Sequence, residues 1–436
     1  MAKSVKQMIN KPTKKPLLVV IYPYKFTDFV YRLMELGYFE RYCDVIVWDI
    51  SPVTTPNLSK AVSAESSKNN NVMILSSLRD FFRCLSELRK RSTEANICIV
   101  NEVTNSSFFE FICNWIITAF LRTKNIAVLD LYNGGVPLRF PVRAVGSSLG
   151  FLARGLRFVK NASTLSEAKH KISSLLFGWL ASFLPSATTH RLIAGEDWLL
   201  LAKSIDVERN KIRLVYGHSY DYSNNLLHKL KSSSLTSVRS QNSIAVLLDG
   251  AGPMFASDSA LSGRKVHFTT DVWYPALCRF FDRLEAETGV QTEIAGHYKS
   301  VHPPIAPCFG SRPVYYGKTI ELVRNCEFVI TRTSTAISHA VMFRKPVIFI
   351  YSNQLKEDRE AMRDIRGMAA MLGNEPVNVD GPPFEISDLL KVNDEQYLNY
   401  EKACLTSAGS QRPNVQIILE DILNIDTGAE FYKEVR

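Results

Sequence analysis

The feature that most constrains the fold is an alternation of short, mostly apolar runs with stretches of helical periodicity. In the first half of the chain the apolar runs are PLLVVIYP (16–23), DVIVWDI (44–50), NVMILSS (71–77), NICIVNEV (96–103) and NIAVLDLYNGG (125–135). Such runs are typical of strands that are buried on both faces of a parallel sheet, and the helices between them supply the right-handed crossovers. The pattern predicts a Rossmann-type lobe from about residue 16 to 140, although Tyr24 and Lys25 follow the first strand where a dinucleotide fingerprint would need glycines.

The same alternation returns in the second half, after a less regular stretch over 140–215. The runs are SIAVLLDGAG (243–252), VQTEIAGHY (290–298), EFVITR (327–332) and KPVIFIY (345–351). A chain of 436 residues is long enough for two such lobes. We therefore predict a basic tail over 1–15, a first Rossmann-like lobe over 16–235, a second over 236–395, and C-terminal helices over 396–436 that pack back across the lobes.

Composition narrows the class of protein. With 46% hydrophobic and 22% charged residues, the chain is typical of globular proteins. Its eight cysteines show no CxxC spacing, which indicates reduced thiols and predicts a cytoplasmic protein. The net charge of +9 suits an anionic partner, and the absence of zinc-ligand or RNA-recognition motifs argues against nucleic acid as that partner.

Two apolar stretches raise the question of a membrane. Residues 108–121 and 172–185 are both shorter than the roughly 18 to 20 residues that a spanning helix needs. The segment 149–185 mixes Arg and Lys with Leu, Phe and Trp, as a helix lying on a membrane surface does. We expect this amphipathic segment to place the protein peripherally on the inner face of the cytoplasmic membrane, with the anionic surface as a partner; two core or interdomain helices are the alternative.

Polar residues that follow the strands of the second lobe are the candidates for chemistry, because ligands of open parallel sheets lie at the carboxyl ends of the strands. Thr333, Ser334 and Thr335 come after the strand 327–332 and before a helical pattern. Hydroxyls and free amides at a helix start bind phosphate, and Arg332 beside them adds positive charge. A Ser/Thr helix cap without any ligand is the alternative.

Two further turns of the second lobe are candidate sites. His302 and Pro303 lie in a proline-rich loop with Lys299, where a rigid backbone would orient the imidazole toward a phosphate, unless the histidine is simply a surface residue. Asp249 and Gly250 end an aliphatic strand, which places a carboxylate where a general base or nucleophile is needed; an Asx turn is the plain alternative.

These motifs together carry a resemblance. LLDGAG, KSVHPP and TRTSTAISHAVMFRKPVIFI resemble the acidic-Gly, His-Pro and Ser/Thr motifs of bacterial GT-B glycosyltransferases that use CMP-activated nonulosonic acids, namely polysialyltransferases and the Kdo transferases of capsule and O-antigen assembly. The resemblance covers about 240–355. It implies a GT-B fold, with two Rossmann-like lobes whose parallel sheets face a central cleft, and transfer of a sugar such as Kdo or a sialic acid onto a surface polysaccharide.

The resemblance also implies roles for single residues. His302 and Pro303 would contact CMP and its leaving phosphate, Ser334 and Thr335 would bind the donor phosphate, and Asp249 would be the base of an inverting enzyme. The family usually has two adjacent acids where this chain has Leu248 and Asp249, so Asp271, Glu293 and Glu102 stay open as the catalytic carboxylate, and so does the stereochemical outcome.

No cofactor or metal is expected, because helix amides with His302, Lys318 and Arg332 would neutralise the leaving phosphate. The expected partners are a CMP-sugar donor and a glycan or lipid-linked glycan acceptor. Two alternatives remain: a GT-B enzyme that uses UDP-sugars, such as a transferase or a UDP-GlcNAc 2-epimerase-like enzyme, and a catalytically inactive binding protein of envelope assembly.

Overall fold

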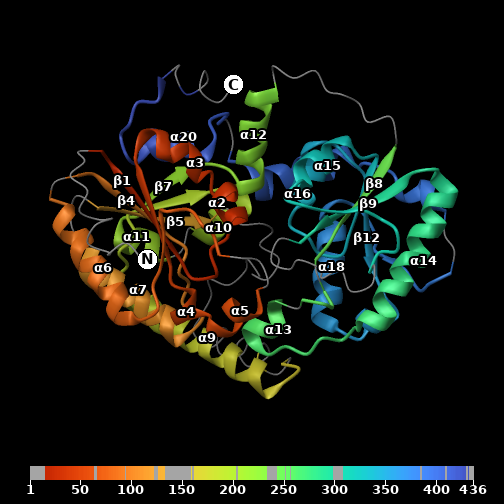
Figure 1. Cartoon of the computed structure of the whole chain (residues 1–436), viewed down its shortest axis with the longest axis horizontal. Helices are drawn as coiled ribbons and strands as arrows, with labels where there is room; N and C mark the ends of the chain where they lie inside the picture. Colours follow the sequence, from red (N-terminus) through yellow and green to blue (C-terminus); the bar gives the residue numbers. More distant parts are fainter. Residues whose placement is uncertain are drawn as a thin grey trace.

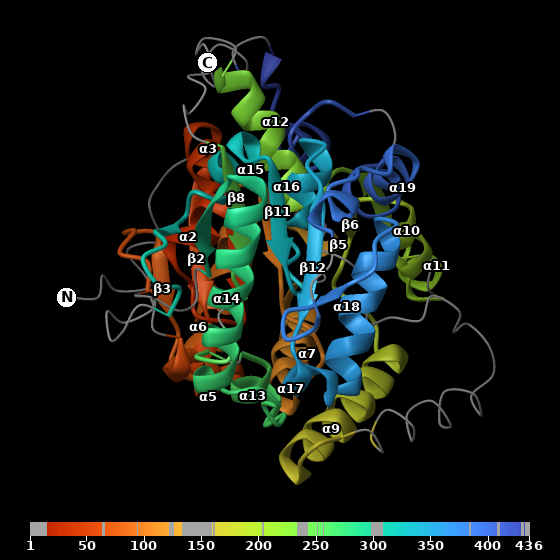
Figure 2. The same ribbon diagram turned by 90° about the vertical axis from the view of Figure 1, so that its right-hand side faces the viewer.

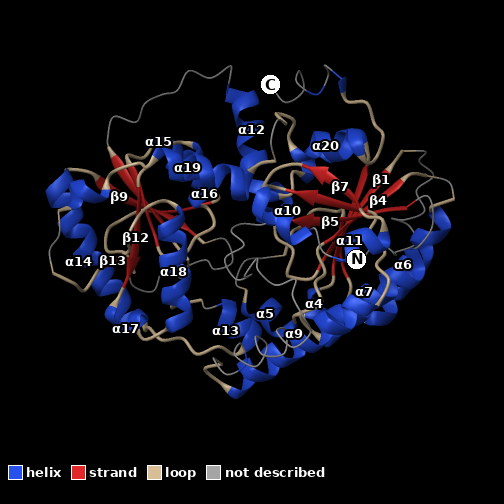
Figure 3. Cartoon of the chain, turned by 180° about the vertical axis from the view of Figure 1, so that it is seen from behind, coloured by secondary structure: helices blue, strands red, loops and turns tan. Residues whose placement is uncertain are grey.

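A computed structural model shows two α/β lobes side by side (Figure 1). The structure describes residues 15–62, 66–93, 95–121, 126–132, 159, 162–202, 205–232, 243–250, 252–255, 257–297, 308–382, 385–407, 410–428 and 431. Each lobe has a parallel sheet between helices, as Figure 3 shows by colour. The expected GT-B architecture of two Rossmann-like lobes is confirmed.

The first lobe is built on a seven-stranded parallel sheet in the order β3-β2-β1-β4-β5-β6-β7. Its strands are β1 (Leu17–Tyr22), β2 (Asp44–Asp49), β3 (Val72–Ile74), β4 (Ile97–Asn101), β5 (Ile126–Tyr132), β6 (His190–Ile193) and β7 (Arg213–Tyr216). The strands β6 and β7 lie in the stretch whose sequence pattern is less regular. They are four residues each and begin with polar residues, so they carry little of the apolar signal that marks β1.

Helices cover both faces of this sheet. They are α2 (Asp28–Leu33), α3 (Leu36–Tyr42), α4 (Ser51–Thr54), α5 (Pro56–Ala61), α6 (Leu78–Arg91), α7 (Phe108–Leu121), α9 (Leu165–Phe183), α10 (Glu196–Ala202) and α11 (Ile205–Asn210). Because successive side chains of a strand point to opposite faces, Leu18 and Val20 of β1 pack with α3, whereas Val19 and Ile21 pack with α6 and α7. Burial on both faces explains why β1 is a continuous aliphatic run.

The second lobe has a six-stranded parallel sheet in the order β10-β9-β8-β11-β12-β13. Its strands are β8 (Ile244–Leu248), β9 (Gln291–Gly296), β10 (Val314–Tyr316), β11 (Phe328–Thr331), β12 (Val347–Tyr351) and β13 (Val377–Asn378). Its helices are α13 (Ser257–Ser262), α14 (Thr270–Thr288), α15 (Thr319–Asn325), α16 (Ile337–Met342), α17 (Asn353–Lys356), α18 (Arg359–Met371), the 3-10 helix η1 (Ile386–Leu389), α19 (Asp394–Tyr400) and the π-helical turn η2 (Glu401–Leu405).

Three connections hold the lobes together. Helix α12 (Tyr220–Ser232) packs against α16 of the second lobe, and α20 (Asn414–Asp421) at the end of the chain packs against α3 of the first. At the lower edge in Figures 1 and 2, α13 packs against α5 and α9. There Lys171 Nζ of α9 lies 2.9 Å from Glu167 Oε1 and 3.0 Å from Glu360 Oε1 of α18, so α9 joins the two lobes through a buried ion-pair cluster.

Among the residues that the structure describes, no helix is both long and apolar enough to cross a bilayer. In the amphipathic segment predicted over 149–185, residues 149–158, 160 and 161 lie outside the described part of the chain, and most of the remainder forms α9.

Candidate functional site

The strand order of each lobe contains a point where the direction of chain progression reverses. In the second lobe this point lies between β8 and β11, because the chain continues from β8 to β9 on one side and from β11 to β12 on the other. In the first lobe it lies between β1 and β4. Ligands of doubly wound sheets bind outside the carboxyl ends of the strands at such points. Asp249 directly follows β8, Arg332 directly follows β11, and Glu102 directly follows β4.

The structure brings Arg332 against the glycine-rich turn that follows β8. The guanidinium carbon lies 4.8 Å from the ring centroid of Phe268. A Cβ atom on Gly250 would lie 3.4 Å from Arg332 Nη2, and one on Gly252 would lie 3.3 Å from it and 3.0 Å from Phe268 Cζ. Gly252 therefore makes room for the guanidinium between the turn and the ring, whereas a Cβ atom on Gly250 would only come into contact with it.

Asp249 lies beside this arrangement. It is 8% exposed, and its backbone N–H donates to Ala295 O of β9 at 3.1 Å. Burial raises the pKa of the neighbouring Tyr274 hydroxyl above its usual range; the charge of Asp249 raises it further, while Arg332 lowers it. Asp249 and Arg332 thus lie within electrostatic reach of one hydroxyl at the carboxyl edge of β8.

The hydroxyl-rich turn differs from the expectation in one respect. Helix α16 begins only at Ile337, its N-cap is Ala336, and no side chain caps it, so Thr333, Ser334 and Thr335 lie next to the N-cap but do not cap the helix. Two amides of the turn are satisfied by its own hydroxyls: Ser334 N donates to Thr331 Oγ1 at 3.2 Å, and Ala336 N donates to Ser334 Oγ at 3.3 Å. Local hydrogen bonding of these hydroxyls competes with helix formation and delays its start.

The remaining predicted site residues are placed as follows. Lys299, His302 and Pro303 lie outside the described residues. Lys318 is exposed and follows β10, with Nζ 5.5 Å from the Tyr315 ring centroid. Since β10 is three strands away from β11, and neighbouring strands lie about 4.8 Å apart, Lys318 leaves the sheet roughly 14 Å from Arg332.

The three alternative carboxylates differ sharply in position. Asp271 is exposed in the first turn of α14, and Glu293 lies within β9, before its carboxyl end. Glu102 is half-buried at the end of β4 and accepts a hydrogen bond of 2.7 Å from Tyr220 Oη at the start of α12. Burial raises the pKa of Glu102 to about 7, the hydrogen bond from Tyr220 opposes this, and the charge of Asp130 adds to it. Glu102 therefore exchanges its proton near neutral pH.

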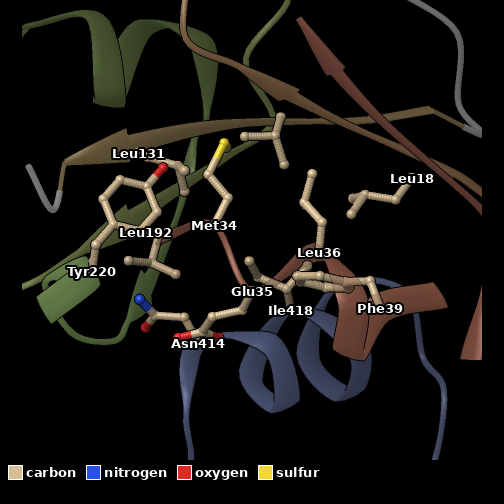
Figure 4. Close-up of a pocket in the computed structure, with 11 residues that line it drawn as sticks. Leu18, Met34, Glu35, Leu36, Phe39, Leu131, Leu192, Tyr220, Asn414 and Ile418 are labelled. Carbon is tan, nitrogen blue, oxygen red and sulfur yellow. The ribbon is translucent and has the colours of Figure 1, made fainter. Parts of the chain in front are cut away.

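A second buried carboxylate lies nearby in the first lobe, on the side that faces α20. Glu35, together with Tyr220, Asn414 and apolar side chains, lines a cavity of about 20 Å³ (Figure 4). Glu35 Oε2 accepts from Val415 N at 3.0 Å, while Oε1 has no hydrogen-bond partner within the described part of the chain. Because burial dominates, the pKa of Glu35 is raised to about 7. The cavity has room for a single water molecule and is too small for a sugar.

The described residues offer an anion site more readily than a cation site. In the described ranges, no group of three or more His, Cys, Asp and Glu side chains is placed to hold a metal ion. Arg332 and the turn amides around it can bind an anionic group such as a phosphate. Transfer without a metal stays a prediction.

Comparison with known proteins gives likeness of fold only. No family model and no curated protein sequence matches the chain. Among solved structures, it is similar to UDP-GlcNAc 2-epimerase from Methanocaldococcus jannaschii, with 12% identity, a TM-score of 0.43, and coverage of 93% of this chain and 98% of that one. It is also similar to MurG from Acinetobacter baumannii, with 9% identity, a TM-score of 0.41, and coverage of 94% and 99%. The wall teichoic acid polymerase TagF is similar at 11% identity, with a TM-score of 0.43 and coverage of 99% and 92%.

Proposed function

We propose that the chain is a glycosyltransferase. Its nucleotide-sugar donor would bind at the topological switch point between β8 and β11 of the second lobe, and its acceptor at the switch point between β1 and β4 of the first. The observation that carries this proposal is the position of Arg332, which lies between the Phe268 ring and the glycine-rich turn that follows Asp249. A guanidinium in this position is oriented before any ligand arrives, and an oriented cation stabilises the charge that develops on a leaving phosphate.

The acceptor is proposed to lie on the opposite side of the cleft. Helix α5, which follows β2, packs against α13, which follows β8, so elements from the carboxyl edges of both sheets meet. An acceptor held near Glu102 would then face a donor held near Arg332. In the proposed reaction the acceptor oxygen bonds to the anomeric carbon of the sugar, the bond from that carbon to the phosphate oxygen breaks, and a carboxylate takes the acceptor proton.

Two residues compete for the role of that carboxylate. The resemblance of LLDGAG to the acidic motif assigns the role to Asp249, with His302 and Pro303 on the leaving nucleotide. Glu102 is the second candidate, because a base with a pKa near 7 on the acceptor side matches the pH at which a hydroxyl must be activated.

The donor class also has two candidates. The motif resemblance favours a CMP-linked nonulosonic acid such as Kdo or a sialic acid, transferred to a surface polysaccharide. A UDP-sugar is the alternative, because the turn after β8 and the turn after β11 are adjacent and together offer amides to two phosphates.

The test begins with thermal shift measurements using CMP, UDP, CMP-Kdo, CMP-sialic acid and UDP-GlcNAc. Wild-type protein should be stabilised by one nucleotide class, and Arg332→Ala should lose that stabilisation. Arg324→Ala is the matched control, because Arg324 also stacks on a ring, 5.2 Å from Phe343, but belongs to α15. No stabilisation by any of the nucleotides would overturn the proposal.

Turnover then separates the activities. A transferase should release the nucleotide faster when an acceptor glycan is present. An epimerase would convert UDP-GlcNAc without any acceptor, and an inactive binding protein would bind a nucleotide yet turn over no donor.

A further inference from the structure

Helix α9 exposes an apolar stripe that the described part of the chain leaves uncovered. Leu165, Ile172, Leu176, Trp179 and Phe183 recur at helical spacing, and they are between 47% and 74% exposed. The opposite side of the helix is where its folding contacts lie: Phe177 packs on Phe108 and Phe111 of α7, and Lys171 bonds to the second lobe. The side chains of the stripe therefore do not take part in packing this helix against the rest of the protein.

Helix α7 extends the apolar surface. Phe108, Phe109 and Trp115 are 50%, 44% and 52% exposed, which is unusual for three aromatic side chains of one helix. Figures 1 and 2 show α7 and α9 together at one edge of the molecule. We call the exposed side chains of these two helices the α7/α9 face.

The charged side chains of α7 and α9 that reach the surface are of one sign. The only carboxylates of α7 and α9 are Glu110 and Glu167, and both are turned inward, at 1% and 2% exposure. Glu110 accepts from Thr104 and Ser106, and Glu167 pairs with Lys171, so neither reaches the surface. Lys169, in contrast, is exposed and lies on the stripe between Leu165 and Ile172.

Helix α6 borders this face. Phe82 of α6 packs on Phe120 of α7 with ring centroids 4.5 Å apart, so the outer side of α6 adjoins the α7/α9 face. Arg79 is exposed near Phe82; Arg83 is also exposed but is paired with Asp80, with Nη2 2.6 Å from Oδ1. The apolar surface thus has basic residues within and beside it.

We propose that the α7/α9 face docks on the surface of an anionic lipid bilayer. Tryptophan and phenylalanine favour the boundary between headgroups and acyl chains, and lysine extends from an apolar helix to lipid phosphates. The inward-turned carboxylates remove the repulsion that an anionic surface would otherwise exert. A second copy of this chain fits less well, because two such faces would bring like charges together.

Docking through α9 would act on both lobes. Because Lys171 binds Glu360 of α18 and Thr164 Oγ1 donates to Gly263 O at 2.6 Å, α9 is attached to both lobes. A bilayer that holds α9 would hold both lobes at once. The proposal does not depend on which reaction the cleft performs.

The experiment is co-sedimentation of the full chain with phosphatidylcholine vesicles, with and without phosphatidylglycerol. We expect binding that requires phosphatidylglycerol and weakens as salt shortens the electrostatic range to about 8 Å and below. Ile172→Ser with Leu176→Ser should lower the partition coefficient by about tenfold or more, since both side chains would leave the acyl boundary. Ile74→Ser with Leu398→Ser is the matched control, because it removes the same two side-chain types, 54% and 41% exposed, from other elements.

A second readout locates the contact. Lipids brominated on the acyl chain should quench the emission of Trp115 and Trp179 in the wild type and in the control. Nucleotide binding by the Ile172→Ser, Leu176→Ser variant should be unchanged, which separates loss of docking from loss of the proposed active site. The proposal is overturned by absence of vesicle binding, by equal binding to neutral vesicles, by unquenched emission, or by a wild-type dimer that the variant dissociates.

Discussion

Replacing Glu35 with glutamine should make the stability of the first lobe less sensitive to pH. Glu35 is 3% exposed, lines the small cavity shown in Figure 4, and has one carboxylate oxygen without a hydrogen-bond partner among the described residues. An ionised carboxylate is poorly solvated there, whereas in the unfolded chain it is surrounded by water. Glutamine has nearly the same shape and carries no charge at any pH.

The size of this change in the free energy of unfolding follows from the pKa of Glu35. Burial raises the pKa of Glu35 from its ordinary value of 4.5 to about 7. Since each pKa unit corresponds to about 1.4 kcal/mol, burying the ionised Glu35 side chain above pH 7 lowers the free energy of unfolding by about 3 kcal/mol. A raised folded pKa means that this stability is fully present below pH 4.5, declines as pH rises, and is lost above pH 7. Between about pH 5 and about pH 8.5 the loss is about 2.5 kcal/mol.

Urea unfolding at these two pH values measures the effect. The free energy of unfolding of Glu35→Gln, minus that of the wild type, should increase by about 2.5 kcal/mol from the lower to the higher pH. Trp48, fully buried in the same lobe, contributes to the fluorescence signal. Glu208→Gln is the control, because Glu208 of α11 is exposed. A difference that stays constant over this range would show that Glu35 titrates alike in the folded and unfolded chain, and would refute the reasoning.

Three further predictions concern other parts of the molecule. Lys171→Met should cost about 3 to 5 kcal/mol of stability in thermal unfolding, because it leaves Glu167 buried without its cation and leaves Glu360 only the longer contact of 3.7 Å with Arg264. Lys391→Met, whose ion pair is exposed, should cost less than about 1 kcal/mol. Gly252→Val should weaken nucleotide binding in a titration without unfolding the protein, since the new side chain displaces Arg332; unchanged affinity would contradict this. If Glu102 is the base, wild-type turnover should rise with pH through about 7, and Glu102→Gln should be slow and lack that rise in a pH–rate profile. If Glu102→Gln keeps the wild-type pH–rate profile, Glu102 is not the base of the reaction.

The strands that build the candidate site were open to prediction from local patterns. β1, β8 and β11 are short, apolar and buried, so composition and length alone identify them. The rule that ligands lie at carboxyl ends then selects Asp249 and Arg332, because each directly follows its strand. The strands and the residues that directly follow them depend on neighbours in sequence, so they can be predicted without coordinates.

Other features depend on neighbours in space, and only the tertiary structure decided them. That β11 lies beside β8, and that Arg332 lies over Phe268, follows from strand order and not from any local pattern. The late start of α16 reflects hydrogen bonds within the turn that outweigh the capping preference of its hydroxyls.

Burial is the clearest case. Glu35 and Glu102 are glutamates like any others in the sequence, and only packing withdraws them from water and raises the pKa of each to about 7. The apolar residues of α9 fit a core helix and a membrane-surface helix equally well in the sequence. Their exposure is a property of how α9 meets its neighbours, since a side chain is buried by the whole fold and not by its own segment.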